Sequence, residues 1–268
     1  MGGSYAKALK KGGYTVNAIT KEPSDAEYAM EHGLADRVET KVDKQLVGNA
    51  DLIIFALYPH IFLEWITENQ HLIKSGAVIT DVTGVKGCIV DKIQSILRSD
   101  VEFIAAHPMA GRERSGIKYS DSSIFEVANY IVTPTEKNTD RAIELCTSLG
   151  ETLGFAHISR LSPERHDEII AFLSQLTHCI AVSLMCSSSD HDLVNYTGDS
   201  FRDLTRIARI NDEMWSELFL DNRSALLREM KLFKQSFDKM YRAIEHNDRE
   251  GIREMMRIST ERRGWFDR

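Results

Sequence analysis

Residues 51–59 read DLIIFALYP, and this stretch decides the fold class. After its first residue the run is continuously apolar through position 57, as expected of a parallel strand that is covered on both faces. Tyr58-Pro59 stops the run. Further β-like runs occupy 14–20, 77–81, 102–106 and 130–132, and helical patterns occupy 5–11, 23–31, 41–47, 60–69, 86–97 and 139–149. This alternation predicts right-handed βαβ units and a Rossmann-like parallel sheet.

The pattern becomes almost entirely helical from Ser162 onward. Ser162-Pro163 is typical of a helix N-cap followed by proline in the first turn, and the helix should run to about Met185. We therefore expect two domains, a dinucleotide-binding domain at 1–158 and a helical domain at 159–268. One apolar stripe should face the core and comprises Ile169, Phe172, Leu173, Leu176, Ile180 and Leu184. A second stripe should pack against neighbouring helices or a second subunit and comprises Leu226, Leu227, Met230, Phe233, Phe237, Met240 and Ile244.

Composition excludes several classes of protein. The chain has 268 residues and a net charge of −7, with basic residues scattered among acidic ones, which argues against a nucleic-acid surface. No apolar run approaches the roughly 20 residues that cross a bilayer, and no secretion signal is apparent. Four widely spaced cysteines without a C-x-x-C pair favour reduced thiols in the cytoplasm. No metal-ligand spacing occurs.

The N-terminus resembles the second half of a dinucleotide-binding βαβ unit. Gly2-Gly3-Ser4 precedes a helix and then a strand, and helix N-termini bind phosphates through unpaired N–H groups. The first strand and the leading glycines of such a unit are missing from this pattern. A flexible helix start is the alternative. Thr20 and Lys21 stand where an acidic residue usually binds the ribose, so NADP is not excluded beside NAD.

His107-Pro108-Met109-Ala110-Gly111-Arg112-Glu113 follows the β-like run 102–106. Proline disfavours the α region for the preceding residue, so His107 should end the strand at the edge where α/β sheets bind ligands. An ordinary histidine in a surface loop is the alternative.

The helical half carries two further candidate pairs. Ser174 and His178 lie four residues apart and share one mixed helix face, where a packed histidine is the simpler interpretation. Arg202 and Arg206 are also four apart, and two guanidinium groups could clamp a carboxylate. Ion pairing of these arginines with Asp203 or nearby acids is the alternative.

These motifs together resemble the prephenate dehydrogenase family, also called arogenate dehydrogenase. The matching motifs are Asp81-Val82-Thr83-Gly84-Val85-Lys86, the segment from His107 to Glu113 with Ser115-Gly116, Leu176-Thr177-His178, and Phe201 to Ala208 followed by Met214-Trp215. The resemblance implies a Rossmann domain joined to a helical dimerisation domain, with the active site between them. It implies oxidative decarboxylation of prephenate to 4-hydroxyphenylpyruvate in tyrosine biosynthesis, with hydride transfer to NAD, by a homodimer.

The resemblance also implies roles for single residues. His107 would take the proton of the ring hydroxyl, His178 and Arg206 would hold the substrate, and Trp215 would approach from the partner subunit. Glu113 would belong to the polar network at the entrance, with Ser174 and Arg202 as further substrate contacts. Many members have Gly-Ser at Thr83-Gly84, so Thr83 would have to supply the serine hydroxyl. The implied cofactor contacts are Gly2, Gly3, Ser4, Thr20, Lys21, Leu57, Tyr58, Pro59, Thr83 and Gly84.

Alternative functions stay open at this point. Arogenate differs from prephenate by an amine in place of a keto group. A β-hydroxyacid dehydrogenase would carry a catalytic lysine in the first long helix of its second domain, and no lysine lies between Pro163 and Met185. The third alternative is a non-catalytic helical dimer that binds an aromatic acid. It stays open because the glycine fingerprint for the cofactor is incomplete in this sequence.

Overall fold

The computed structural model describes residues 1–111 and 116–267. The chain forms two compact units, residues 1–222 and 223–268. This division lies at residue 222, and the helices between residues 159 and 222 belong to the same compact unit as the sheets. The expected domain boundary near residue 158 therefore stays a prediction.

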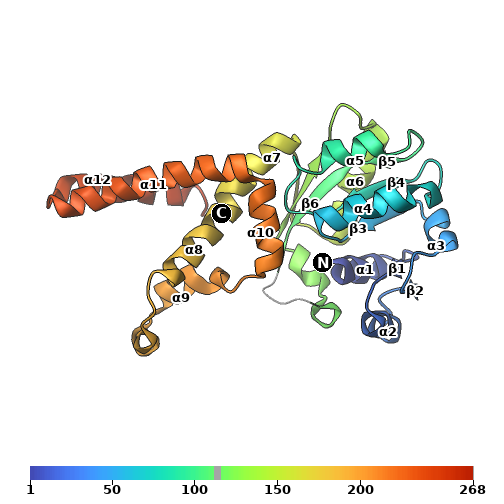
Figure 1. Ribbon diagram of the computed structural model, residues 1–268, viewed down its shortest axis with the longest axis horizontal. Coiled ribbons are helices and arrows are strands. Elements are labelled where there is room, and N and C mark those ends of the chain that lie inside the picture. The colour runs from blue at the N-terminus through green and yellow to red at the C-terminus, as the bar shows by residue number, and fades with distance from the viewer. Residues whose placement is uncertain (112–115, 268) are drawn as a thin grey trace. The chain divides into compact units, whose positions relative to one another are not determined.

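In the described part of the chain, eight short strands form three small sheets, two of them parallel (Figure 1). The parallel sheets are β1-β2 and β3-β4-β5, and the third, β6-β7-β8, begins with an antiparallel pair. The strands are β1 (Asn17–Ile19), β2 (Arg37–Glu39), β3 (Leu52–Phe55), β4 (Val78–Asp81), β5 (Glu102–Phe103), β6 (Ala105–Met109), β7 (Asn129–Thr133) and β8 (His157–Arg160). The fold is a Rossmann-like α/β arrangement followed by helices, as predicted, although the sequence patterns did not indicate β2 and β8.

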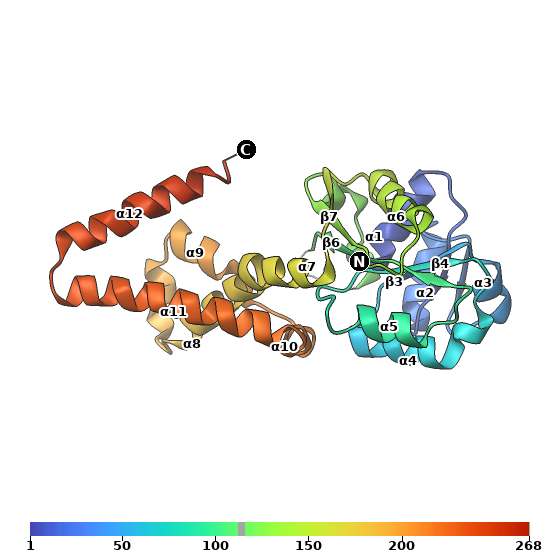
Figure 2. The same cartoon turned by 90° about the horizontal axis from the view of Figure 1, so that it is seen from above.

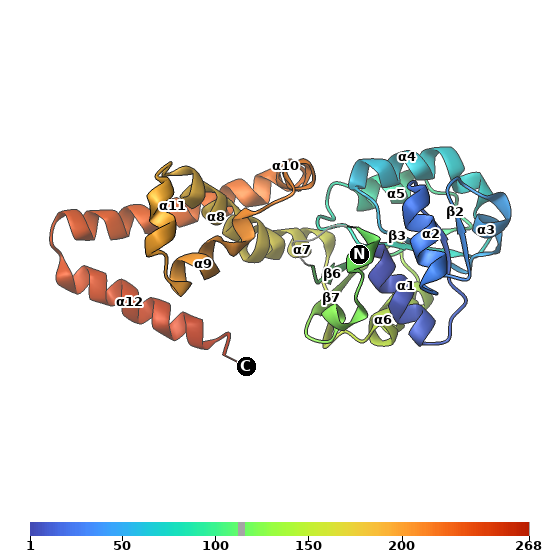
Figure 3. The same cartoon turned by 90° about the horizontal axis from the view of Figure 1, so that it is seen from below.

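Helices cover the sheets on both sides. Figures 2 and 3 show α4 and α5 on one side and α1 and α6 on the other. The helices of this part are α1 (Gly2–Lys11), α2 (Pro23–Glu31), α3 (Lys44–Asn49), α4 (Pro59–Asn69), α5 (Val90–Ile96) and α6 (Asp140–Leu153). Side-chain caps from Asp43 and Thr139 begin α3 and α6.

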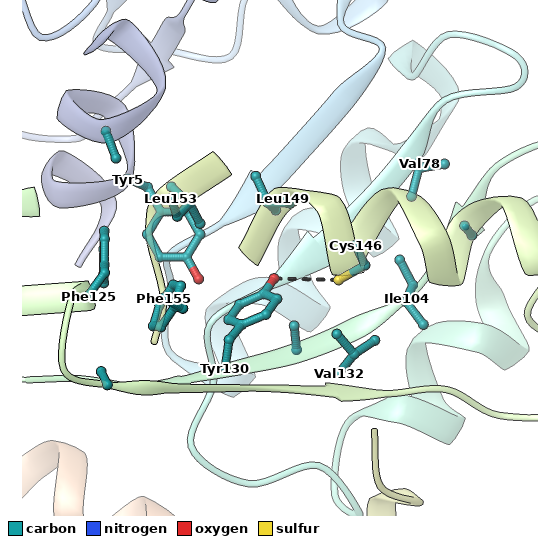
Figure 4. Close-up of a cluster of buried hydrophobic side chains, with 14 residues drawn as sticks. Tyr5, Val78, Ile104, Phe125, Tyr130, Val132, Cys146, Leu149, Leu153 and Phe155 are labelled. Atoms are coloured by element: carbon teal, nitrogen blue, oxygen red, sulfur yellow. Dashed lines mark hydrogen bonds between the residues drawn. The ribbon is translucent and has the colours of Figure 1, made fainter. Parts of the chain in front are cut away.

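Two buried clusters hold the strands and these helices together. Figure 4 shows the cluster between α1, α6 and β7, where Tyr130 and Leu149 are buried and the Tyr130 hydroxyl lies 3.4 Å from Sγ of Cys146. The second cluster, under α4 and α5, includes the fully buried Phe62 and Ile93. The carboxyl ends of the parallel strands are thereby fixed, and the loops that follow them carry the candidate residues.

Residue His107 lies inside β6, so the expectation that it ends a strand was wrong. β5 pairs with β4 at Phe103, and the chain then leaves that sheet and pairs with β7, with His107 opposite Ile131. Proline pushes its preceding residue to an extended conformation, which is compatible with a continuing strand. Pro108 is tolerated because β6 is the edge strand of its sheet.

The helical segment after β8 begins with one long helix. It consists of α7 (Pro163–Ile170), a π-helical turn (Ala171–Leu176) and α8 (Thr177–Cys186). By length and composition alone this helix could cross a membrane, although no membrane-spanning run was expected from the sequence. Core helices of globular proteins pass the same test, so this is weak evidence.

The buried side of this helix differs from the predicted stripe. Phe172 and Leu173 are exposed, whereas Ile170, Ala171 and Ala181 are buried. The π-helical turn changes the angular register of the side chains, which a count at 3.6 residues per turn does not anticipate.

Shorter helices complete the first unit, and two long helices form the second. The former are α9 (Asp199–Thr205), a 3₁₀ turn (Arg206–Ala208) and α10 (Asp212–Asp221). The second unit pairs α11 (Arg223–Glu245) with α12 (Arg249–Gly264). Within it, Leu227, Phe233 and Phe237 of α11 are exposed in the single chain, so the packing of their stripe against other helices or a second subunit stays a prediction.

Candidate active site

The candidate site is centred on His107 and the polar groups around it. Nδ1 of His107 lies 2.9 Å from Nε2 of His166, and Nδ1 of His166 lies 2.7 Å from Oδ1 of Asp167. His107 is half-buried, whereas His166 and Asp167 are buried. Three side chains from β6 and α7 therefore form one hydrogen-bonded row that ends at His107.

The carboxylate of Asp167 joins this row to the loop after β4. Its oxygens accept the backbone N–H of Lys86 at 2.8 Å and that of Gly87 at 2.7 Å. Its own backbone carbonyl accepts Nδ2 of Asn222 at 2.8 Å. These bonds hold the start of α7 against the β4 loop and fix His166 beside β6.

Beneath the row lies a buried ion pair. Nζ of Lys86 donates to Asp81 at 2.7 Å, to the carbonyl of Ala106 at 2.6 Å and to Oγ1 of Thr83 at 3.2 Å. The side chains of Lys86 and Asp81 are fully buried. Asp81 also accepts the N–H of Ala106 at 3.1 Å. The pair thus ties the end of β4 to the residue that precedes His107.

Burial dominates the electrostatics of both histidines. Desolvation lowers the pKa of His107 well below its usual range, and the neighbouring His166 and Lys86 act in the same direction. Burial also lowers the pKa of His166, against the opposing hydrogen bond of Asp167. Both imidazoles are therefore neutral at pH 7, and a neutral histidine can accept a proton.

The hydroxyl of Thr83 is buried and bonded to Asp81, which corrects the expectation that Thr83 supplies a reactive hydroxyl. This hydroxyl donates a short hydrogen bond to Asp81, and Oγ1 also lies 3.1 Å from the carbonyl oxygen of Val85. Gly84 instead borders His107. A Cβ added to Gly84 would lie 3.9 Å from Nε2 of His107 and 3.6 Å from the methyl groups of Leu218.

Helix α10 connects His107 to the second group of predicted residues. Leu218 borders Gly84, and Trp215, three residues earlier on α10, stacks on His178 with ring centroids 3.7 Å apart. Nδ1 of His178 donates to the carbonyl of Ser174 at 2.8 Å. The resemblance implied that Trp215 approaches from a partner subunit. Here Trp215 contacts His178 of its own chain.

Both predicted arginines are exposed. Arg202 donates to Asp199 at 2.6 Å and to the carbonyl of Thr197 at 3.2 Å. Arg206 begins the 3₁₀ turn that packs against α8, the helix of His178. The helix ends between them, so the expected single helix face for both is wrong. Glu113 lies outside the described residues.

Most of the predicted cofactor residues follow the ends of parallel strands. Thr20 and Lys21 follow β1, Leu57, Tyr58 and Pro59 follow β3, and Gly84 follows β4. Gly2 and Gly3 begin α1. A Cβ at Gly2 would lie 3.1 Å from that of Ala56, so helix and strand approach closely, as in dinucleotide-binding units. The buried Ser4 hydroxyl accepts the N–H of Asp121 at 3.0 Å and so holds a neighbouring loop.

Reasoning from the sequence did not select His166 or Asp167 as site residues. Asp81 and Lys86 were noted only as the two ends of a motif. The available signal was the His166-Asp167 pair in the first turns of a helix that begins with Ser162-Pro163. Nothing local indicates which strand that pair meets, because His107 and His166 are 59 positions apart.

Comparisons with known proteins agree across the chain. Residues 5–158 match the family model "Prephenate dehydrogenase, nucleotide-binding domain", and residues 162–258 match "Prephenate dehydrogenase, dimerization domain". A prephenate dehydrogenase of Bacillus subtilis is 31% identical, over 94% of this chain and 70% of the relative.

Solved structures give the same result. The prephenate dehydrogenase of A. aeolicus, in complex with hydroxyphenyl propionate and NAD⁺, aligns with a TM-score of 0.91 and 28% identity, over 100% of this chain and 95% of the other. The arogenate dehydrogenase of Synechocystis aligns at 0.83 and 25%, over 99% and 96%. On the family-model matches and the Bacillus subtilis relative, the chain belongs to the prephenate dehydrogenase family of NAD-dependent oxidoreductases.

Proposed function

We propose that the protein oxidatively decarboxylates prephenate to 4-hydroxyphenylpyruvate in tyrosine biosynthesis, with NAD as the hydride acceptor. The observation that carries the proposal is His107, a neutral imidazole whose Nδ1 is engaged by His166 and whose Nε2 borders Gly84. A base with one ring nitrogen held and the other directed at a ligand-binding edge suits removal of a hydroxyl proton.

The chain's residues would divide the reaction between them. His107 accepts the proton of the ring hydroxyl at Nε2, and the electrons of that O–H bond form the carbonyl as hydride departs from the same carbon. The bond to the ring carboxylate breaks, carbon dioxide leaves and the electron pair of that bond enters the ring. The π electrons of the new carbonyl return to its oxygen, which takes up a proton, so that the ring becomes an aromatic phenol. NAD, when bound, takes up the hydride. The surroundings of α1 and the strand ends fit such a dinucleotide, because small residues and helix N–H groups meet there.

Substrate binding is assigned to the helical side. His178, held by Ser174 and stacked on Trp215, presents a fixed imidazole, and Arg206 on the turn packed against α8 supplies a cation for a substrate carboxylate. Arg202 contributes less in this arrangement, since Asp199 and Thr197 hold it. Glu113 stays a predicted member of the entrance network.

We infer that the protein works as a homodimer in the cytoplasm. The match to a dimerization domain covers residues 162–258, and exposed apolar side chains on α11, Leu227, Phe233 and Phe237 among them, give a second copy a surface to cover. The four cysteines are free thiols, as expected of a reducing compartment. Light scattering should give twice the mass of 30.4 kDa, and a monomer at micromolar concentration would contradict this inference.

The experiment for the function is nicotinamide reduction, followed by absorbance of the reduced cofactor, with prephenate or arogenate and with NAD or NADP. We expect the highest kcat/KM with prephenate and NAD. A preference for arogenate would change the substrate, and the absence of turnover with both would refute the proposed function. Lys21, exposed after β1, is the residue to examine if NADP is preferred.

A further inference from the structure

The row from Asp167 to His107 has a defined direction. A carboxylate accepts hydrogen bonds and donates none, and Asp167 already receives two backbone N–H groups, so it is the acceptor for His166. Nδ1–H of His166 must therefore donate to it. A neutral imidazole carries only one N–H, so Nε2 of His166 is an acceptor, and Nδ1–H of His107 is its donor.

This direction leaves the proton of His107 on Nδ1 and a lone pair on Nε2. Nε2 is the nitrogen that borders Gly84. The opposite tautomer would point an N–H at the substrate hydroxyl, and the histidine could not then accept a proton there.

We propose that His166, itself oriented by Asp167, is a positioning residue that holds His107 in the tautomer whose Nε2 accepts the substrate's proton. The inference rests on the proposed function for its kinetic consequence, but the tautomer itself is a property of the free protein. Neither residue touches the reacting atoms in this scheme. They act through His107, as the aspartate of a Ser-His-Asp triad orients its histidine.

The same row of hydrogen bonds also stabilises the imidazolium of His107 that forms on proton transfer. When His107 becomes an imidazolium, its Nδ1–H still donates to the neutral Nε2 of His166, whose own N–H donates to the carboxylate of Asp167. The negative charge of Asp167, buried and anchored by Lys86 and Gly87, thus supports the positive charge as it forms. Among the residues that the structure describes, His166 and Lys86 act on His107, with Lys86 opposing that positive charge, and Asp167, Lys86 and Asp81 act on His166.

Two substitutions of His166 separate positioning from a merely structural role. His166→Gln keeps an amide oxygen near the place of Nε2, so it can still accept from His107. His166→Asn keeps an amide near the place of Nδ1, where it donates to Asp167, but it does not reach His107. Both variants replace a buried imidazole by a smaller amide, so their losses in folding stability should be similar, and thermal unfolding checks this.

The measurements are the ¹⁵N shifts of His107 in protein labelled at histidine, and kcat and KM for prephenate with NAD. We expect Nδ1–H in the wild type and in His166→Gln, and a shift toward Nε2–H in His166→Asn. In His166→Asn kcat should fall about 10²-fold, the usual contribution of a general base, with KM changing far less, and His166→Gln should recover part of that loss. His107→Asn protein assigns the signal.

Two results would overturn the proposal: a wild-type His107 that carries its proton on Nε2, or equal kcat values for the Asn and Gln variants. Failure of the proposed function looks different, because the wild type would then not turn over prephenate while the ¹⁵N shifts still report the tautomer.

Discussion

Nζ of Lys86 lies 2.7 Å from Oδ2 of Asp81, and both side chains are completely buried. The same ammonium group donates to the carbonyl of Ala106, next to His107. The pair is thus a structural link between the end of β4 and the strand of the proposed base.

Removal of one partner should therefore be costly. Lys86→Met leaves the carboxylate of Asp81 buried without its cation, and such a loss typically costs about 3–5 kcal/mol of unfolding free energy. Urea unfolding measures the difference. The double variant Lys86→Met with Asp81→Leu is the control, and it should recover part of the loss because no lone charge remains. A single-variant loss below about 1 kcal/mol would contradict the importance of the pair.

Activity should persist at mildly acidic pH. Burial lowers the pKa of His107 well below the ordinary value of about 6.5. The neutral base is then present above its folded pKa, so the kcat profile should stay level down to about pH 6.5 and fall only at lower pH. An acid limb in kcat with a midpoint at or above that ordinary value would show that His107 is not desolvated as described.

Folding stability, like activity, should decrease on acidification. Between the lowered folded pKa and the unfolded value, the unfolded chain binds more protons than the folded one, so stability rises with pH in that window and is lost on acidification. His107→Asn removes one such group and should flatten the dependence of the unfolding free energy below about pH 6.5. An unchanged slope in that variant would argue against the lowered pKa.

The two arginines provide a matched pair for substrate binding. Arg206→Ala should mainly raise the KM for prephenate, because the turn that carries Arg206 packs against α8, the helix of His178. A hydrogen bond to a charged group is worth about 1.5–3 kcal/mol, which corresponds to roughly a tenfold change or more. Arg202→Ala should change KM much less, since Asp199 and the carbonyl of Thr197 already engage the Arg202 guanidinium. Equal effects of the two substitutions would remove Arg206 from the clamp.

Two glycines should respond differently to an added side chain. Gly84→Ser places Cβ at ordinary contact distance from Leu218 and His107, so unfolding free energy should change by less than about 0.5 kcal/mol. Gly150→Ala places Cβ 2.6 Å from the buried ring of Tyr130. Overpacking of this kind costs about 1–3 kcal/mol, more than the roughly 1 kcal/mol that alanine adds to helix propensity. Denaturant unfolding compares them, and a Gly150→Ala protein as stable as the wild type would contradict the packing described.

Sequence reasoning anticipated the order of elements well where apolar runs were continuous. The run at 51–57 contains β3, Pro23 begins α2 as expected, and α4 begins at Pro59, one residue before the expected start at His60. The edge strand β2 was missed because Arg37 and Glu39 flank a single valine, which gives no apolar run.

The candidate site was predicted less completely, for reasons of geometry. His107 and His178 were selected from motifs, but the inward rotation of the Thr83 hydroxyl depends on where Asp81 and Lys86 meet in space. The contact between His166 and His107 depends on the antiparallel pairing of β6, which no local pattern encodes. Hydrophobic periodicity predicts helices and strands, but it does not predict the tertiary contacts between residues that are far apart in the sequence.

The central claim is that His107 removes the substrate's proton, and His107→Asn tests it most directly. Single-turnover nicotinamide reduction with saturating prephenate should slow by about 10²-fold or more, while the dissociation constant for prephenate changes far less. A variant that reacts at nearly the wild-type rate would contradict the account.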